Sequence, residues 1–220
     1  MVLVDLAASK AMGSAAVLLF LTVLMLAAAK RMSTSIVAFA LQSAVLAAQV
    51  LAVAHIHRST ESYVIGGLVI LIKVLGIPYA LFRLVDKLQA PRDVKLSLSP
   101  VYSVFITAGL IFLSFTAVHT YVQELRVSED VLAAAVALIL SGAFLMVSHG
   151  KALMQIIALL VLENGIFLAA LITTFGMPMI IEIGVFFDLV MGVLLMGIFA
   201  FRIRDTFEHL DVSKLRRLRG

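Results

Sequence analysis

The chain has 220 residues, of which 63% are hydrophobic and only 14% are charged. Its mean hydropathy of +1.14 is too high for a soluble domain of this size, so we expect an all-α polytopic integral membrane helix bundle. The sequence contains no cysteine, which excludes disulfides, thiolate-held zinc, iron–sulfur clusters and attached c-type haem.

Seven apolar segments of about twenty residues predict about seven transmembrane helices. In chain order they are Met12–Ala29, Met32–Ala54, Tyr63–Phe82, Pro100–Val122, Val131–Ser148, Ala152–Phe175 and Pro178–Phe201. The polar break at Gln123–Asp130 divides an N-terminal four-helix part, residues 1–127, from a C-terminal three-helix part with a basic tail, residues 128–220.

Basic residues concentrate on one side of the predicted membrane. With seven alternating spans, 13 of the 17 Lys and Arg residues share a side with the C-terminal tail, and three lie on the other side. By the positive-inside rule, the C-terminus is expected in the cytoplasm and the N-terminus outside a bacterial or archaeal cytoplasmic membrane. This topology explains the sequence pI near 9.6, so no nucleic-acid partner is expected.

Two spans carry patterns that indicate contacts between helices. In the second span three polar residues recur every seven positions on one helix face: Ser35, Gln42 and Gln49. Such a stripe more often forms hydrogen bonds between helices than a conduit, which is the alternative. In the fifth span Ala133, Ala137 and Ser141 form a small-xxx-small pattern that predicts close helix packing.

The third span contains a lysine near a proline. Lys73 lies about 15 Å from the outer end of its span at 1.5 Å per residue, which is too deep for easy snorkelling to the interface. Pro78 has no amide to bond the carbonyl of Val74, so the helix should loosen just after the lysine. A lysine beside a loosened turn is typical of a coordinating or proton-handling site, and snorkelling is the alternative.

Three carboxylates lie inside the last two spans: Glu163, Glu182 and Asp188. Glu163 lies about 16 Å and Asp188 about 15 Å from the start of their helices, so both are predicted near one mid-membrane plane with Lys73. Burial in lipid disfavours charge, which suits such groups to proton transfer near neutral pH. Glu182, about 6 Å deep, either reaches the interface or stands at the mouth of a proton path.

Catalytic and metal-binding patterns are absent from the sequence. There is no Ser/His/Asp order and no Gly-rich phosphate loop, and the five His residues show no metal-ligand spacing. We therefore expect no catalytic, cofactor-binding or metal site in this chain. The predicted site consists of the proton-transfer residues Lys73, Glu163, Glu182 and Asp188.

The segment LVLENGIFLAAL, the acid in the last span and the basic tail DVSKLRRLRG resemble the three-helix K-type subunit of respiratory complex I over residues 128–220. The seven-span form with PMIIEIGVFFD resembles component E of hydrogenase 4, a membrane subunit of formate-hydrogenlyase-like nickel–iron hydrogenases. By this resemblance Glu163 matches the first membrane glutamate of the K-type subunit, and Asp188 rather than Glu182 matches the second. The chain departs from the pattern by using Asp for Glu, by adding Glu182, and by having His149 and Lys151 in place of an arginine pair.

The resemblance implies a proton path that joins a redox arm to antiporter-like subunits. The chain is then non-catalytic alone, and the nickel–iron centre and iron–sulfur clusters reside in partner chains. Its expected partners are antiporter-like and quinone-site-like membrane subunits, a peripheral hydrogenase arm and the lipid bilayer. A subunit of a multi-subunit cation/proton antiporter and a purely structural spacer are the alternatives.

Overall fold

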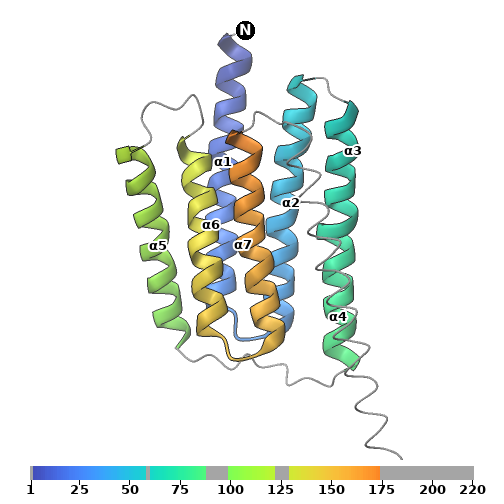
Figure 1. Cartoon of the computed structure of the whole chain (residues 1–220), viewed down its shortest axis with the longest axis vertical. Helices are drawn as coiled ribbons and strands as arrows, with labels where there is room; N and C mark the ends of the chain where they lie inside the picture. Colours follow the sequence, from blue (N-terminus) through green and yellow to red (C-terminus); the bar gives the residue numbers. More distant parts are fainter. Residues whose placement is uncertain (1, 58–59, 88–98, 122–128, 174–220) are drawn as a thin grey trace, which may run out of the picture.

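The structure, a computed structural model, describes residues 2–57, 60–87, 99–121 and 129–173. These residues form α1 (Val2–Ala28), α2 (Met32–His57), α3 (Thr60–Val69), η1 (Ile70–Gly76), α4 (Ile77–Lys87), α5 (Pro100–Tyr121), α6 (Glu129–Ser148) and α7 (Ala152–Thr173). The π-helix η1 joins α3 and α4 into one continuous rod, called the α3–α4 rod below (Figure 1). No strand occurs within these ranges.

The helices confirm the predicted all-α membrane bundle. Five are long and apolar enough to cross a membrane, over Met32–His55, Ser62–Asp86, Pro100–Tyr121, Glu129–Ser148 and Ala152–Thr173, and Ala15–Ala28 is a shorter apolar helix. They coincide with the first six predicted spans to within a few residues. The seventh, Pro178–Phe201, lies outside the described residues, as does the boundary between residues 127 and 128.

Successive rods run in opposite directions, so the turns alternate between the two ends of the bundle. The α1–α2 turn, the end of α4, the start of α5 and the α6–α7 turn lie at the same end (Figure 1). Lys30, Arg31 and Lys151 lie in these turns. The grouping of basic residues on one side, predicted from the alternation of spans, holds for these three.

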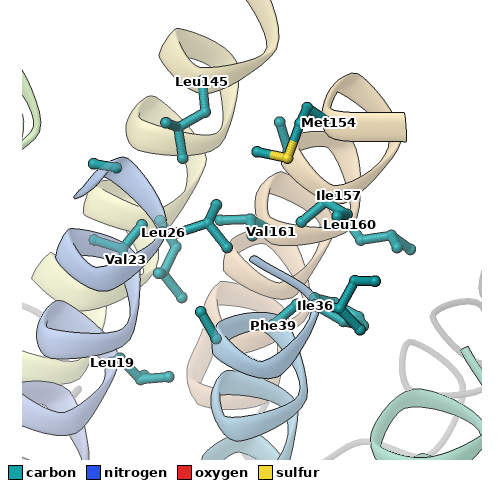
Figure 2. Close-up of a cluster of buried hydrophobic side chains, with 14 of the residues drawn as sticks. Leu19, Val23, Leu26, Ile36, Phe39, Leu145, Met154, Ile157, Leu160 and Val161 are labelled. Carbon is teal, nitrogen blue, oxygen red and sulfur yellow. The ribbon is translucent and has the colours of Figure 1, made fainter. Parts of the chain in front are cut away.

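The main hydrophobic core lies between α1, α2, α6 and α7. Side chains from all four helices meet there (Figure 2), among them Leu26, Phe39, Leu145 and Val161. Each is almost fully buried. Since these helices are apolar nearly all round, hydrophobicity alone does not select the buried face, and close packing between helices has to do so.

α6 and α7 approach each other backbone to backbone at two glycines. A Cβ added at Gly142 would lie 2.6 Å from the backbone nitrogen of Leu162, and one at Gly165 would lie 2.8 Å from the carbonyl oxygen of Ala135. No side chain fits at such distances, so glycine sets the spacing of this pair. The predicted small-residue stripe on α6 is fully buried, at Ala133, Ala137 and Ser141. The close packing predicted for this span is confirmed.

Candidate functional site

Lys73 lies in the middle of the π-helix η1. The backbone N–H of Ile77 bonds the carbonyl oxygen of Ile72, five residues back, which is the wide π spacing. Pro78 follows at once and cannot donate an α-helical bond. The loosened turn predicted from Pro78 is therefore present as a π-helix, a form that occurs mostly as single turns inside α-helices and frequently at functional sites.

Lys73 and Glu163 form an ion pair inside the bundle. The Nζ atom of Lys73 lies 2.9 Å from Oε1 of Glu163, and the two side chains are 1% and 8% exposed. Both residues lie near the middle of their apolar spans, Ser62–Asp86 and Ala152–Thr173. The mid-membrane depth predicted for these two residues therefore agrees with the structure, which also brings them into direct contact. Snorkelling of Lys73 to the interface is wrong, because the side chain is buried against Glu163.

Two other α7 residues surround the ammonium group. Lys73 Nζ also donates to Oδ1 of Asn164 at 3.1 Å, and it lies 5.2 Å from the centroid of the Phe167 ring. An amide oxygen and an aromatic face both stabilise a positive charge. Neither contact with Lys73 was predicted from the sequence. The spacing of Phe167, four residues after Glu163 and therefore on the same helix face, could have indicated the ring.

Hydrogen bonds continue from Asn164 into α2 and α1. Asn164 Nδ2 donates to Oε1 of Gln42 at 3.0 Å and to Oγ of Ser43 at 3.4 Å. Gln42 Nε2 donates to Oγ1 of Thr22 at 3.4 Å, and Thr22 donates to the carbonyl oxygen of Leu19 at 2.7 Å. All of these side chains are buried. Gln42 thus bonds two neighbouring helices, as the interhelical interpretation of the α2 stripe predicted.

The other two members of that stripe behave differently. Ser35 donates to the carbonyl oxygen of Arg31 in its own chain segment at 3.4 Å. Gln49 is buried, and its Nε2 atom has no hydrogen-bond partner among the described residues. The seven-residue period therefore identified one buried face correctly, but only Gln42 on it reaches Asn164.

Two predicted site residues cannot be placed. Asp188 and Glu182 both lie outside the described residues. The structure thus brings together Lys73 and Glu163 from the predicted set. It adds Asn164, Gln42, Thr22 and Phe167 to their surroundings.

The α6–α7 turn contains a buried histidine. His149 is 1% exposed, and its Nδ1 lies 2.8 Å from the carbonyl oxygen of Leu145. A carbonyl only accepts hydrogen bonds, so Nδ1 carries the proton. Gln155 donates to the carbonyl oxygen of His149 at 3.1 Å. Burial lowers the pKa of His149, and the bond to Leu145 offsets this only in part.

The geometry defines what the site can do. It is an ion pair between two protonatable groups at mid-membrane, held in a network of buried polar side chains. In the part of the chain that the structure describes, no group of three or more His, Cys, Asp or Glu residues is placed to hold a metal ion. Proton binding and release by the pair is the chemistry available to these residues.

The chain is similar to the uncharacterized protein Rv0085 of Mycobacterium tuberculosis. The two are 32% identical over 157 residues, which cover 70% of this chain and 71% of the relative. No family model matches the chain. No solved structure matches it either.

Proposed function

The chain belongs to the same protein family as the mycobacterial protein Rv0085. From the geometry of its buried charges, we propose that it is a membrane subunit that transfers protons through the Lys73–Glu163 pair. The observation that carries the proposal is the 2.9 Å contact between Nζ and Oε1, buried near the middle of two spans. In this function the pair binds and releases one proton at a time within a longer path. The predicted site residues Asp188 and Glu182 are proposed to lie on the same path.

Stability alone is a weak reason for such a pair. Charged groups at the bilayer centre are costly, and replacing a buried ion pair by well-packed apolar residues is often neutral or stabilising. This chain nevertheless has a buried ion pair near the middle of two apolar spans. A π-helix at the lysine adds a second departure from regular structure at the same place. Both features favour proton handling over a purely mechanical role.

The proposed setting is a hydrogenase-4-like complex in the cytoplasmic membrane. Support comes from the likeness of LVLENGIFLAAL and of the basic tail to the K-type and component E subunits. In this setting the C-terminus is cytoplasmic and the N-terminus outside, and redox cofactors are bound by partner chains. Mass spectrometry of the co-purifying subunits tests the setting. Nickel and iron in the complex support it, whereas antiporter subunits without these metals would favour a cation/proton antiporter.

The test of proton transfer is Glu163→Gln, which keeps the size of the side chain but cannot exchange a proton. We expect proton translocation in membranes to be lost while the abundance of the complex, followed by immunoblot, stays normal. Glu163→Asp should retain part of the activity because the carboxyl group survives with a shorter reach. The matched control is Glu129→Gln at the start of α6. It removes a carboxylate whose side chain is 33% exposed and whose Oε2 atom lies 2.6 Å from Nδ1 of His119 in α5.

Each outcome decides between two functions. Loss in Glu163→Gln with normal translocation in Glu129→Gln supports a proton path through the pair. Wild-type translocation in Glu163→Gln at normal abundance would contradict it. The chain would then be a structural spacer, in which the ion pair only joins helices.

A further inference from the structure

A series of hydrogen bonds leads from Lys73 through Asn164 and Gln42 to α1, and every bond in it has its donor on the side of the lysine. Lys73 donates to Asn164, Asn164 to Gln42, and Gln42 to Thr22, whose hydroxyl donates to the carbonyl oxygen of Leu19. An ammonium group has no acceptor and a carbonyl oxygen has no donor, so the two ends fix the orientation of both amides between them. The oxygen of each amide therefore points toward the lysine.

This orientation affects the charge of Lys73. Aligned hydrogen bonds polarise one another, and their electrostatic effect is stronger in a low-dielectric interior than in water. The Asn164 oxygen that accepts from Lys73 is thereby a better acceptor than an isolated amide would be. The Phe167 ring, 5.2 Å from Nζ, acts in the same sense. These contacts stabilise the ammonium form without using the Glu163 carboxylate.

The same bonds form a dead end for protons. Carboxamides neither take up nor release protons near neutral pH, and the last donor, Thr22, bonds a backbone carbonyl of its own helix. The bonds from Asn164 to Thr22 can hold Lys73 but cannot carry protons away from it. A proton therefore cannot leave Lys73 along these bonds, whereas the carboxylate of Glu163 can take up and release one.

We propose that Asn164, held by Gln42, is a positioning residue that holds the Lys73 ammonium group beside Glu163 as a fixed counter-charge, so that Glu163 is the member of the pair that exchanges protons. The inference rests on the proposed function and deepens it. On loading, a solvent-derived proton bonds to a carboxylate oxygen of Glu163, whose charge changes from −1 to 0. On release that O–H bond breaks and the proton moves on along the path. Lys73 keeps its three N–H bonds and its contact with Asn164 throughout, and no electrons are transferred.

The charged groups around Lys73 in the described helices are consistent with this division of roles. Glu163 of α7 contacts it directly, and α2 presents the uncharged Gln42 and Ser43 toward Asn164. α3 and α4 carry their charged residues ten or more positions from Lys73 along the rod, at Glu61, Arg83, Asp86 and Lys87. The titration of Glu163 should therefore report directly on how firmly the ammonium group is held.

The decisive variant is Asn164→Ala, studied as the full chain in lipid nanodiscs by infrared spectroscopy over a range of pH. The carboxyl band of Glu163 is identified by its absence in Glu163→Gln. We expect this band to appear at a pH higher by about one unit, a tenfold change in proton affinity, because the counter-charge is held less firmly. Gln42→Met leaves Asn164 in place with only its longer bond to Ser43 on α2, and should shift the band by less in the same direction.

Ser114→Ala is the matched control, because Ser114 is a buried hydroxyl that bonds the Leu110 carbonyl of its own helix. It should leave the titration of Glu163 unchanged. In membranes that contain the intact complex, the alkaline limb of the pH profile of translocation, where Glu163 can no longer be loaded, should move to higher pH in Asn164→Ala. A role limited to joining helices would reduce the amount of folded protein without moving either pH dependence.

The outcomes separate this inference from the proposed function. Unchanged titration in folded Asn164→Ala overturns the positioning role, even if Glu163→Gln abolishes translocation. If Asn164→Ala does not fold, Gln42→Met decides in its place, and an unshifted band there overturns the inference. If translocation survives Glu163→Gln, the proposed function fails, whereas the infrared titration still reports whether Asn164 positions Lys73.

Discussion

α7 and the α3–α4 rod supply the two partners of the ion pair, but different contacts hold them in place. In α7, 61% of the residues in the apolar window are buried, against 39% in the rod. α7 touches the backbone of α6 at Gly165, whereas a Cβ at Gly67 of the rod would meet no atom of the described residues within 4 Å. Glu163 is therefore positioned by close packing of its helix. Lys73 is positioned mainly by its own polar contacts and by the π-helix around it.

This difference predicts that Gly165 of α7 and Gly67 of the rod respond oppositely to the same substitution. Packing against a neighbouring backbone tolerates no added atom, because the interior is close-packed. A helix position with open space around its glycine, such as Gly67, gains from a better helix former. The five predictions below test the contrast, from the largest expected effect to the smallest.

The largest effect is expected when the ion pair is broken from the side of the rod. Lys73→Met leaves Glu163 buried without its cationic partner and should lower the free energy of unfolding by about 3–5 kcal/mol. The double variant Lys73→Met/Glu163→Gln should recover most of this loss. The measurement is denaturant-induced unfolding of the full chain in detergent micelles. A double variant as unstable as Lys73→Met would mean that Lys73 acts through packing rather than charge.

Gly165→Ala tests the packing of α7. The added Cβ lies 2.8 Å from the Ala135 carbonyl oxygen, and backbone atoms cannot turn aside as a flexible side chain can. We expect the free energy of unfolding to fall by about 1–3 kcal/mol, the usual cost of overpacking. Thermal unfolding in detergent measures it. A variant as stable as the wild type would show that α6 and α7 separate at little cost.

Gly76→Ala tests the wide turn that holds Lys73. A Cβ there would lie 3.1 Å from the carbonyl oxygen of Leu71, five residues back, because the π spacing brings that oxygen close. A loss of about 1 kcal/mol is expected, at the low end of the range for overpacking. Thermal unfolding alongside Gly165→Ala gives the comparison. A gain in stability would indicate that the turn relaxes toward an ordinary α-helix.

A pH effect of similar size is expected from His149, in the turn that precedes α7. The rod has no histidine that could produce such an effect. Burial lowers the pKa of His149 in the folded chain, so its contribution to stability is fully present above the unfolded value of 6.5. That contribution is lost as pH falls through the folded pKa, by at most about 1.4 kcal/mol per pH unit for one proton.

The measurement is the melting temperature between pH 7.5 and 5 in detergent, for the wild type and for His149→Gln. The difference between the two proteins isolates the contribution of His149. The wild type should lose more stability toward acid than His149→Gln. Parallel pH curves would show that His149 is protonated in the fold at no cost.

The smallest effect is a gain. Gly67→Ala in the rod places a methyl group in open space and should raise the free energy of unfolding by about 0.5–1 kcal/mol, since alanine loses less backbone entropy in a helix than glycine does. It is the counterpart of Gly165→Ala, with the opposite sign expected from the same substitution. If both variants lost stability, the contrast between the two helices would be wrong.

Much of the candidate site could be predicted from residue spacing. The rise of 1.5 Å per residue sets the depth of a residue once the ends of its apolar span are known. For this reason the sequence predicted a common depth for Lys73 and Glu163, and Pro78 predicted a disturbed turn close to the lysine. Depth says nothing about which side of a helix a residue occupies. The contact between the two charges therefore could not be derived from their positions alone.

The sequence by itself determined the helical class, the limits of the first six spans and the placing of ionisable groups at mid-membrane, because hydropathy and helical rise act along a single chain segment. Only the tertiary structure decided which neighbours those groups meet. α1, α2, α6 and α7 are apolar nearly all round, so their rotation and adjacency follow from contacts such as Gly142 with Leu162 and Gly165 with Ala135. Those contacts turn Asn164 toward both Lys73 and Gln42. The sequence does not indicate which residues this asparagine contacts, since its partners come from two other helices.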